Sequence, residues 1–142
     1  MNEMSKRLKT RIVPRRKIST GLSSGSVILC ADNSGGRVLR LVQVMGYKGV
    51  KRRVPGAAVG DMVKVSVREG VPDMRKKMFE AVIVRQRKPY RRKDGTWIQF
   101  DDNAAVIITP EGEPKGSNIK GAVAREVTER WPRLAGISKI VV

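Results

Sequence analysis

Residues 79–108 have the sequence FEAVIVRQRKPYRRKDGTWIQFDDNAAVII, in which an apolar run stands at each end and a basic segment lies between. Short runs rich in β-branched residues fit the pleated surface of a core strand, so residues 81–84 and 104–108 are predicted to be buried strands. The segment between them has no acidic residue before Asp94, and its cations are too costly to bury unless they are paired. These cations are Arg85, Arg87, Lys88, Arg91, Arg92 and Lys93. The stretch therefore predicts a two-stranded cationic ribbon anchored in a core.

The turn of this ribbon is predicted at Asp94-Gly95, because that dipeptide tolerates the positive φ angles of a tight hairpin. Pro89 lacks a backbone donor and therefore suits an edge or bulged position. Trp97 has two open interpretations. It either packs across the hairpin onto a neighbouring side chain or stacks on a base.

Three segments before the ribbon also have the pattern of strands. Residues 26–31 form an apolar run that ends in the turn-forming residues 32–36. Residues 37–45 carry apolar side chains that switch parity, which indicates a bulge or burial on both faces. Residues 63–67 alternate valine with polar residues, as a half-buried strand does. Five strands with turn-rich links predict a mainly β fold, namely a small five-stranded β-barrel, closed or partly open.

The length of 142 residues allows one domain of ordinary size. We expect residues 25–142 to form that domain, with a helical part at about 111–142. Residues 1–24 carry seven basic residues and one acidic residue and should bury little, so they are predicted to be a basic N-terminal extension.

The C-terminal part is predicted to contain a short helix. Between residues 123 and 131 the large apolar side chains recur every four residues, which places them on one helical face, and Pro132 should end the helix. So short a helix must pack against another surface to be stable. The charges of residues 111–142 are far more balanced than those of residues 1–24, so this part is predicted to face protein, with Val127 and Trp131 as the protein-docking residues. Glu126 and Arg130 have the spacing of an ion pair along the helix.

Two further expectations concern the end of the chain and its single cysteine. Residues 137–142 are apolar enough to add a short strand. Cys30 lies in an apolar run and is expected to be a small core residue, since one cysteine allows neither an intrachain disulfide nor a zinc site.

The net charge of +17 indicates a polyanionic partner, with nucleic acid as the first candidate. A membrane surface is disfavoured because there is neither an 18-residue apolar run nor a basic amphipathic helix with an aromatic face. The chain starts with polar and basic residues, and its first apolar run begins at Val27, so no signal peptide is expected. The expected location is the cytoplasm.

The basic residues predicted to bind RNA fall in the extension, in two loops before residue 78 and in the ribbon. They are Arg15, Arg16, Lys17, Lys48, Lys51, Arg52, Arg53, Arg75, Lys76, Lys77, Arg87, Lys88, Arg91, Arg92 and Lys93. Aromatic residues make up only 4% of the chain, so base-stacking platforms are scarce apart from Tyr90 and Trp97. Cations in separate loops suit phosphate contacts on a folded RNA, which is recognised more by its shape than by its base edges.

Enzymatic chemistry has little support in the sequence. Histidine, the commonest general base and metal ligand, is absent. The carboxylates at 101–102 or 111–113 offer at most a magnesium site, although both pairs are typical of turns. No phosphate-binding loop motif is present. We therefore expect no catalytic residue, no metal and no cofactor; the alternatives are a free barrel-type RNA chaperone or translation factor, and a metal-dependent nuclease.

Several motifs spread along the chain resemble one protein family. They are Ala31-Asp32-Asn33-Ser34-Gly35, Val59-Gly60-Asp61, Ala81-Val82-Ile83-Val84-Arg85, Arg91-Arg92-Lys93-Asp94-Gly95, Phe100-Asp101, Asn103-Ala104, and Gly121 with Val123-Ala124-Arg125-Glu126. On these motifs the chain resembles the universal large-subunit ribosomal protein family numbered fourteen. It departs at Ala122, where the family usually has proline, and the extension before Ser24 indicates the archaeal or eukaryotic branch.

This resemblance implies a structural constituent of the large ribosomal subunit built as a five-stranded barrel with a projecting ribbon. It implies binding to large-subunit ribosomal RNA on the face that meets the small subunit, and a bridge to small-subunit ribosomal RNA. It also implies contact with neighbouring large-subunit ribosomal proteins and docking of the anti-association factor called initiation factor six. No membrane and no small-molecule substrate are implied.

Overall fold

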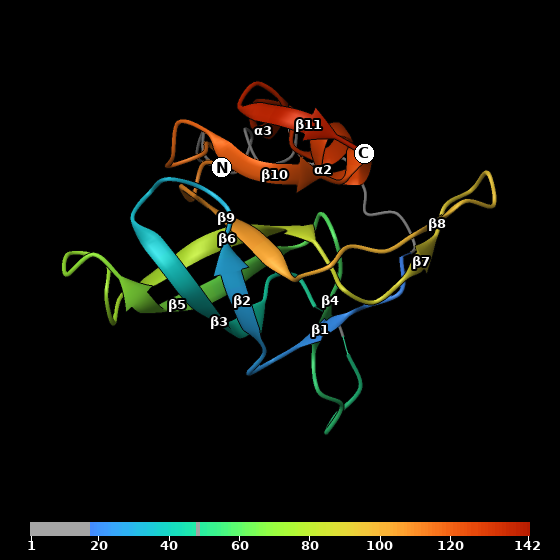
Figure 1. Cartoon of the computed structure of the whole chain (residues 1–142). Coiled ribbons are helices and arrows are strands. Elements are labelled where there is room, and N and C mark those ends of the chain that lie inside the picture. Colours follow the sequence, from blue (N-terminus) through green and yellow to red (C-terminus); the bar gives the residue numbers. More distant parts are fainter. Residues whose placement is uncertain (1–17, 48) are drawn as a thin grey trace, which may run out of the picture.

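Five strands close into a barrel, and the predicted mainly β fold is confirmed. The computed structural model describes residues 18–47 and 49–142. The barrel order is β2-β3-β5-β6-β9 (Figure 1), with only β2 and β9 pairing in parallel. The strands are β2 (Val27–Cys30), β3 (Gly36–Val44), β5 (Met62–Gly70), β6 (Met78–Arg85) and β9 (Ala104–Ile108).

Strands β6 and β9 form a wall shared by two cores. Ala81 and Ile83 face the barrel interior, where they join Val63 and other inward side chains of the barrel strands. The intervening Val82 and Val84 face outward, yet they are buried as well, because the C-terminal part of the chain covers them. Burial on both faces explains why these strands are continuous apolar runs rather than alternating ones.

The C-terminal part forms a unit that covers this wall (Figure 1). It consists of β10 (Ile119–Val123), α2 (Arg125–Arg130), α3 (Pro132–Ala135) and β11 (Ser138–Val141). Strand β11 pairs in parallel with β10, which confirms the short strand predicted at the end of the chain.

The predicted helix over residues 123–131 is shorter than expected. Val123 belongs to β10 because its carbonyl accepts from Val142 N at 2.9 Å, and Ala124 N donates to the Val84 carbonyl at 3.2 Å. Pro132 does more than end a helix, since it starts α3, where its missing N–H and fixed φ are well suited.

Part of the predicted extension is ordered against the barrel. Strand β1 (Leu22–Ser23) pairs with β4 (Gly56–Ala57), and Gly21 N donates to the Ala57 carbonyl at 3.1 Å. Leu22 is buried in the barrel core, so the expectation that residues up to 24 bury little is wrong at this position.

The ribbon between β6 and β9 projects from the barrel (Figure 1). Its strands are β7 (Tyr90–Arg91) and β8 (Trp97–Ile98), which pair antiparallel. Gly95 takes the positive φ of the turn, and the Asp94 carboxylate accepts from Thr96 N at 2.9 Å, so the predicted turn is confirmed. Among the described residues no helix is long and apolar enough to cross a membrane.

Candidate nucleic-acid interface

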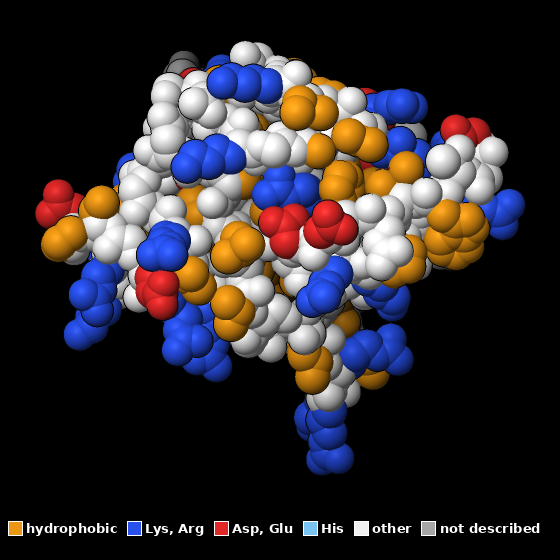
Figure 2. Space-filling view, viewed as in Figure 1, with side chains coloured by type: hydrophobic (Ala, Val, Ile, Leu, Met, Phe, Trp, Pro, Cys, Tyr) orange, Lys and Arg blue, Asp and Glu red, His pale blue; other side chains and the backbone are white. Residues whose placement is uncertain are grey.

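The ribbon carries four exposed cations, namely Arg87, Lys88, Arg91 and Lys93. Its base is held by polar contacts of the backbone, because Arg87 N donates to Asn103 Oδ1 at 2.8 Å. Figure 2 shows that Lys and Arg side chains gather on the protrusions around the barrel. A supported ribbon of this kind offers positive charge at fixed positions.

Two turns add further exposed cations, Lys51 to Arg53 in one and Arg75 to Lys77 in the other. The middle residue of each turn has a positive φ, 70° at Arg52 and 63° at Lys76. This conformation costs a non-glycine residue roughly 1–2 kcal/mol. In the second turn a hydrogen bond from Lys76 N to the Val67 carbonyl, 3.0 Å long, helps to offset that cost. The predicted contacts Arg15, Arg16, Lys17 and Lys48 lie outside the described residues.

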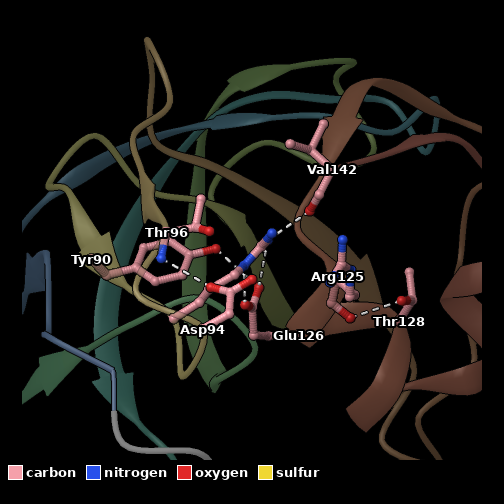
Figure 3. Close-up of polar contacts among 8 residues, drawn as sticks. Tyr90, Asp94, Thr96, Arg125, Glu126, Thr128 and Val142 are labelled. Atoms are coloured by element: carbon pink, nitrogen blue, oxygen red, sulfur yellow. Dashed lines mark hydrogen bonds and ion pairs between the residues drawn. The ribbon is translucent and has the colours of Figure 1, made fainter.

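Arg92 departs from the predicted ribbon surface because it points inward to the C-terminal unit. Its Nε lies 2.7 Å from Glu126 Oε1, and its Nη2 donates to the Val142 carbonyl at 2.6 Å. Tyr90 donates to the other carboxylate oxygen of Glu126 at 2.9 Å (Figure 3). The Arg92 side chain is only 12% exposed, so the prediction that it is a surface cation is wrong.

The environment of Glu126 keeps it ionised. Burial opposes the charged form, but hydrogen bonds from Arg92 and Tyr90 outweigh that effect and lower the pKa of Glu126. Burial and the Glu126 charge together raise the pKa of Tyr90 to about 12. The cluster therefore fastens the ribbon to α2 as an ion pair supported by a neutral phenol.

The predicted pair between Glu126 and Arg130 is wrong, because each residue has another partner. Glu126 bonds Arg92 and Tyr90, while Arg130 Nη1 lies 3.1 Å from Asp61 Oδ1. Arg130 therefore joins α2 to the barrel instead of stabilising its own helix.

Val127 and Trp131 are buried within the chain itself. Trp131 Nε1 donates to the Gly60 carbonyl at 2.9 Å, so the indole fastens the helical unit to the barrel. The predicted docking is thus intramolecular, and the prediction that these two side chains meet another protein is wrong.

One carboxylate of each candidate magnesium pair has a structural contact, and so does the cysteine. Asp102 pairs with Arg85 at 2.9 Å, and Glu113 pairs with Arg133. No group of three or more potential metal ligands occurs within the described part of the chain. Cys30 is partly buried against the barrel core, and burial followed by the charge of Asp32 raises its pKa to about 12.

Two exposed arginines that we did not select from the sequence lie beside Arg75. Arg37 and Arg68 share one shallow cleft with it, where the start of β3 meets the end of β5. The parity switch in residues 37–45, which indicated a bulge or burial on both faces, falls between Leu41 and Val42 and coincides with the register shift between Leu41 and Gln43. The two register shifts beside Arg37 and Arg68 were not predicted. Sequence alone did not show that these shifts would gather arginines.

A closed barrel with cations on a ribbon and two turns defines a class of basic β-barrel protein suited to a polyanionic partner. Within that class, the chain belongs to the family described as Ribosomal protein L14p/L23e, which matches residues 21–142. This confirms the resemblance found in the motifs.

Relatives named Large ribosomal subunit protein uL14 are similar over most of this chain. The Pyrobaculum islandicum protein is 55% identical over 130 residues, covering 90% of each chain. The Saccharolobus solfataricus protein is 54% identical over 128 residues, or 90% of this chain and 93% of the relative. The Thermoplasma volcanium protein is 56% identical over 122 residues, or 86% of this chain and 92% of the relative. The chain is therefore a ribosomal protein of the large-subunit family, which serves translation.

Proposed function

We propose that this chain is a non-enzymatic structural constituent that binds large-subunit ribosomal RNA mainly through phosphate contacts. The observation that carries the proposal is the projecting ribbon, whose exposed cations Arg87, Arg91 and Lys93 are held away from the barrel by a fixed base. The two basic turns at 51–53 and 75–77 add exposed cations outside the ribbon.

The burial of the aromatic residues supports backbone contacts over base reading. Tyr90 is 1% exposed and bonded to Glu126, so it cannot stack on a base, while Trp97 is 65% exposed at the ribbon. One open indole allows one stacking contact, whereas sequence-reading modules stack two or three bases. The interface should therefore recognise RNA shape and charge.

The proposal includes the setting that family membership implies. The ribbon and turns would lie where the large subunit meets the small one, with a bridge to small-subunit RNA and a docking surface for initiation factor six, on cytoplasmic ribosomes. Neighbouring ribosomal proteins would meet the C-terminal unit at β11, where Ile140 and Val141 are exposed. These side chains replace Val127 and Trp131 as the proposed protein-facing residues.

Sedimentation of a lysate through sucrose gradients at low and then high salt tests the proposal. We expect the protein to travel with large subunits at low salt. A protein that stays near the top in both gradients is a free RNA chaperone or translation factor, and the proposal is then wrong.

A binding titration with purified large-subunit RNA tests the phosphate mechanism. With six to ten phosphate contacts, raising monovalent salt from about 50 to about 200 mM should weaken binding by roughly 10³ to 10⁵. A flat salt response contradicts phosphate contacts.

A further inference from the structure

The start of β3 meets the end of β5 at one end of the barrel (Figure 1). A shallow cleft lies at this point. Its volume is about 590 Å³. The side chains that give it charge are Arg37, Arg68, Arg75 and Glu69. Three guanidinium groups and one carboxylate thus surround one opening outside the ribbon.

Two irregularities in the ladder turn the first two arginines into this cleft. Gly36 pairs with Gly70 and Val38 with Glu69, so Arg37 is an extra residue on β3. The next pair is Leu39 with Val67, so Arg68 is an extra residue on β5. Bulges change the direction of side chains and strengthen local twist, and here two of them act within three residues.

Close backbone packing fixes the floor of the cleft. A Cβ on Gly70 would lie 2.6 Å from the Gly35 carbonyl oxygen, so only glycine allows the two segments to approach this closely. Val71 N donates to that same carbonyl at 3.0 Å. The strand ends therefore cannot separate without breaking this contact.

The third arginine arrives on the turn that follows β5. Arg75 N donates to the Val71 carbonyl at 3.1 Å, and Val67 N donates to the Lys77 carbonyl at 3.0 Å. The turn is thus anchored at both ends, and Arg75 is held over the same cleft as the two bulged arginines.

The three guanidinium groups have no side-chain partner in the part of the chain that the structure describes. Within residues 18–47 and 49–142, none of them has a side-chain hydrogen bond or an ion pair, and all three side chains are exposed. By contrast, Arg85, Arg92 and Arg130 each have a carboxylate partner. An anchored but unpaired arginine cluster is available to a ligand.

We infer that this cleft is a separate binding site for the phosphodiester backbone of RNA, with Arg37 and Arg68 as its main contacts and Arg75 closing it. The inference rests on the proposed function and adds a second contact region remote from the ribbon. Arginine forks match phosphate oxygens in bidentate geometry, and each such contact releases counterions from the RNA. Glu69 repels phosphate, and it limits how tightly a bare anion is held.

Another pocket suits this role less well. It lies between the ribbon and α2 and has a volume of about 300 Å³. Its cations are Arg91, Arg92, Lys93 and Arg125, and its carboxylates are Asp94, Glu126 and Glu129. Cations exceed carboxylates by one there, and Arg92 is already paired with Glu126, whereas cations exceed carboxylates by two in the cleft at the barrel end.

The decisive experiment compares two double variants of equal charge in the full chain. Arg37→Gln/Arg68→Gln removes two cations from the cleft, and Lys120→Gln/Lys139→Gln removes two exposed cations from the C-terminal unit. The probe is purified large-subunit ribosomal RNA titrated at several salt concentrations. Melting temperature, followed by circular dichroism, checks that each variant is folded.

The cleft variant should weaken RNA binding by roughly tenfold and lower the salt slope by nearly two units, whereas the matched variant changes each much less. Glu69→Gln should tighten binding by roughly two- to fivefold at low salt, because it removes a repulsive charge from the same cleft. Inorganic phosphate at about 10 mM should leave the affinity of the wild-type chain unchanged beyond its ionic-strength effect.

Three results would overturn the inference. The first is equal RNA affinity and equal salt slope for the two double variants, which contradicts the cleft site but not the proposed function. The second is weaker binding of Glu69→Gln, which shows that the cleft holds no phosphate. The third is specific displacement of RNA by inorganic phosphate, which assigns the cleft to a free anion. Failure of the wild-type chain itself to bind RNA would instead contradict the proposed function.

Discussion

The two tryptophans of the chain occupy opposite environments, with Trp131 6% and Trp97 65% exposed. Trp131→Ala removes a buried ring and its bond to the Gly60 carbonyl, so we expect a loss of about 3 to 5 kcal/mol in the free energy of unfolding. Trp97→Ala should change it by less than about 0.5 kcal/mol. Urea unfolding measures both, and equal losses would show that the indole of Trp131 is not docked.

The ion pair of Glu126 gives stability a specific pH dependence. The pKa of Glu126 is lowered in the folded protein from its ordinary value of 4.5, so ionisation favours folding. This stabilisation is complete above about pH 4.5 and is lost as pH falls through the lower folded value. Glu126→Gln should therefore cost roughly 1 to 3 kcal/mol at pH 7, and the difference from wild type should shrink toward pH 3.

Urea unfolding at a series of pH values measures this difference. Glu111→Gln is the matched control, because Glu111 is exposed in a loop, and it should follow the wild-type curve. A difference between wild type and Glu126→Gln that stays constant from pH 7 to pH 3 contradicts the prediction.

Cys30 should be an unreactive thiol at neutral pH. Burial and Asp32 raise its pKa to about 12, and only the thiolate is nucleophilic. At pH 8 we expect alkylation by iodoacetamide to be at least about 100-fold slower than that of glutathione, with normal reactivity restored in urea. Mass spectrometry follows the reaction, and a rate close to that of glutathione would show that the thiol is accessible and ionised.

The ribbon, as an element, separates RNA contact from stability. Arg87→Ser/Arg91→Ser/Lys93→Ser removes three exposed cations, so the melting temperature should change little while the salt slope of RNA binding falls by nearly three units. Arg92→Ser leaves Glu126 buried without its cation and should destabilise the fold by about 3 to 5 kcal/mol. Unchanged RNA affinity of the triple variant would show that the ribbon is merely solvated.

At the scale of elements, the sequence predicted the features that depend on local patterns. The runs in β6 and β9, the alternation in β5 and the Asp94-Gly95 turn depend on neighbouring residues, and they are confirmed. The roles of Arg92 and Trp131 depend on partners 34 and 71 residues away, Glu126 and Gly60. Charge and spacing could not identify these partners, so a basic residue in a basic run looked solvent-facing.

The same distinction explains the cleft at the barrel end. The parity switch between Leu41 and Val42 indicates a bulge at that point, but it does not mark the bulges at Arg37 and Arg68. Which side chain the bulge turns outward, and what lies beside it, depends on the register with β5. Register is a property of the pair of strands, so Arg37 and Arg68 became candidates only in the folded structure.

At the scale of the whole molecule, the wall of β6 and β9 makes the barrel and the C-terminal unit one cooperative structure. Val82 and Val84 contribute to the outer core with Val127 and Trp131, while Ala81 and Ile83 contribute to the inner core. Neither core can lose this wall without exposing the other. The ion pairs of Arg92 and Arg130 tie the two parts together at further points.

We therefore expect a single unfolding transition for the whole described chain. In a Trp97→Phe background, Trp131 alone reports fluorescence from the junction between α2 and the barrel, while far-UV circular dichroism reports mainly the strands. If the cores are coupled through their shared wall, the two urea curves coincide in midpoint and slope, as two-state unfolding requires. Were the C-terminal unit an independent attachment, Trp131 fluorescence would change at lower urea than the strand signal. Such a gap would contradict the shared wall, because loss of the outer core would then leave β6 and β9 intact with their outward valines exposed.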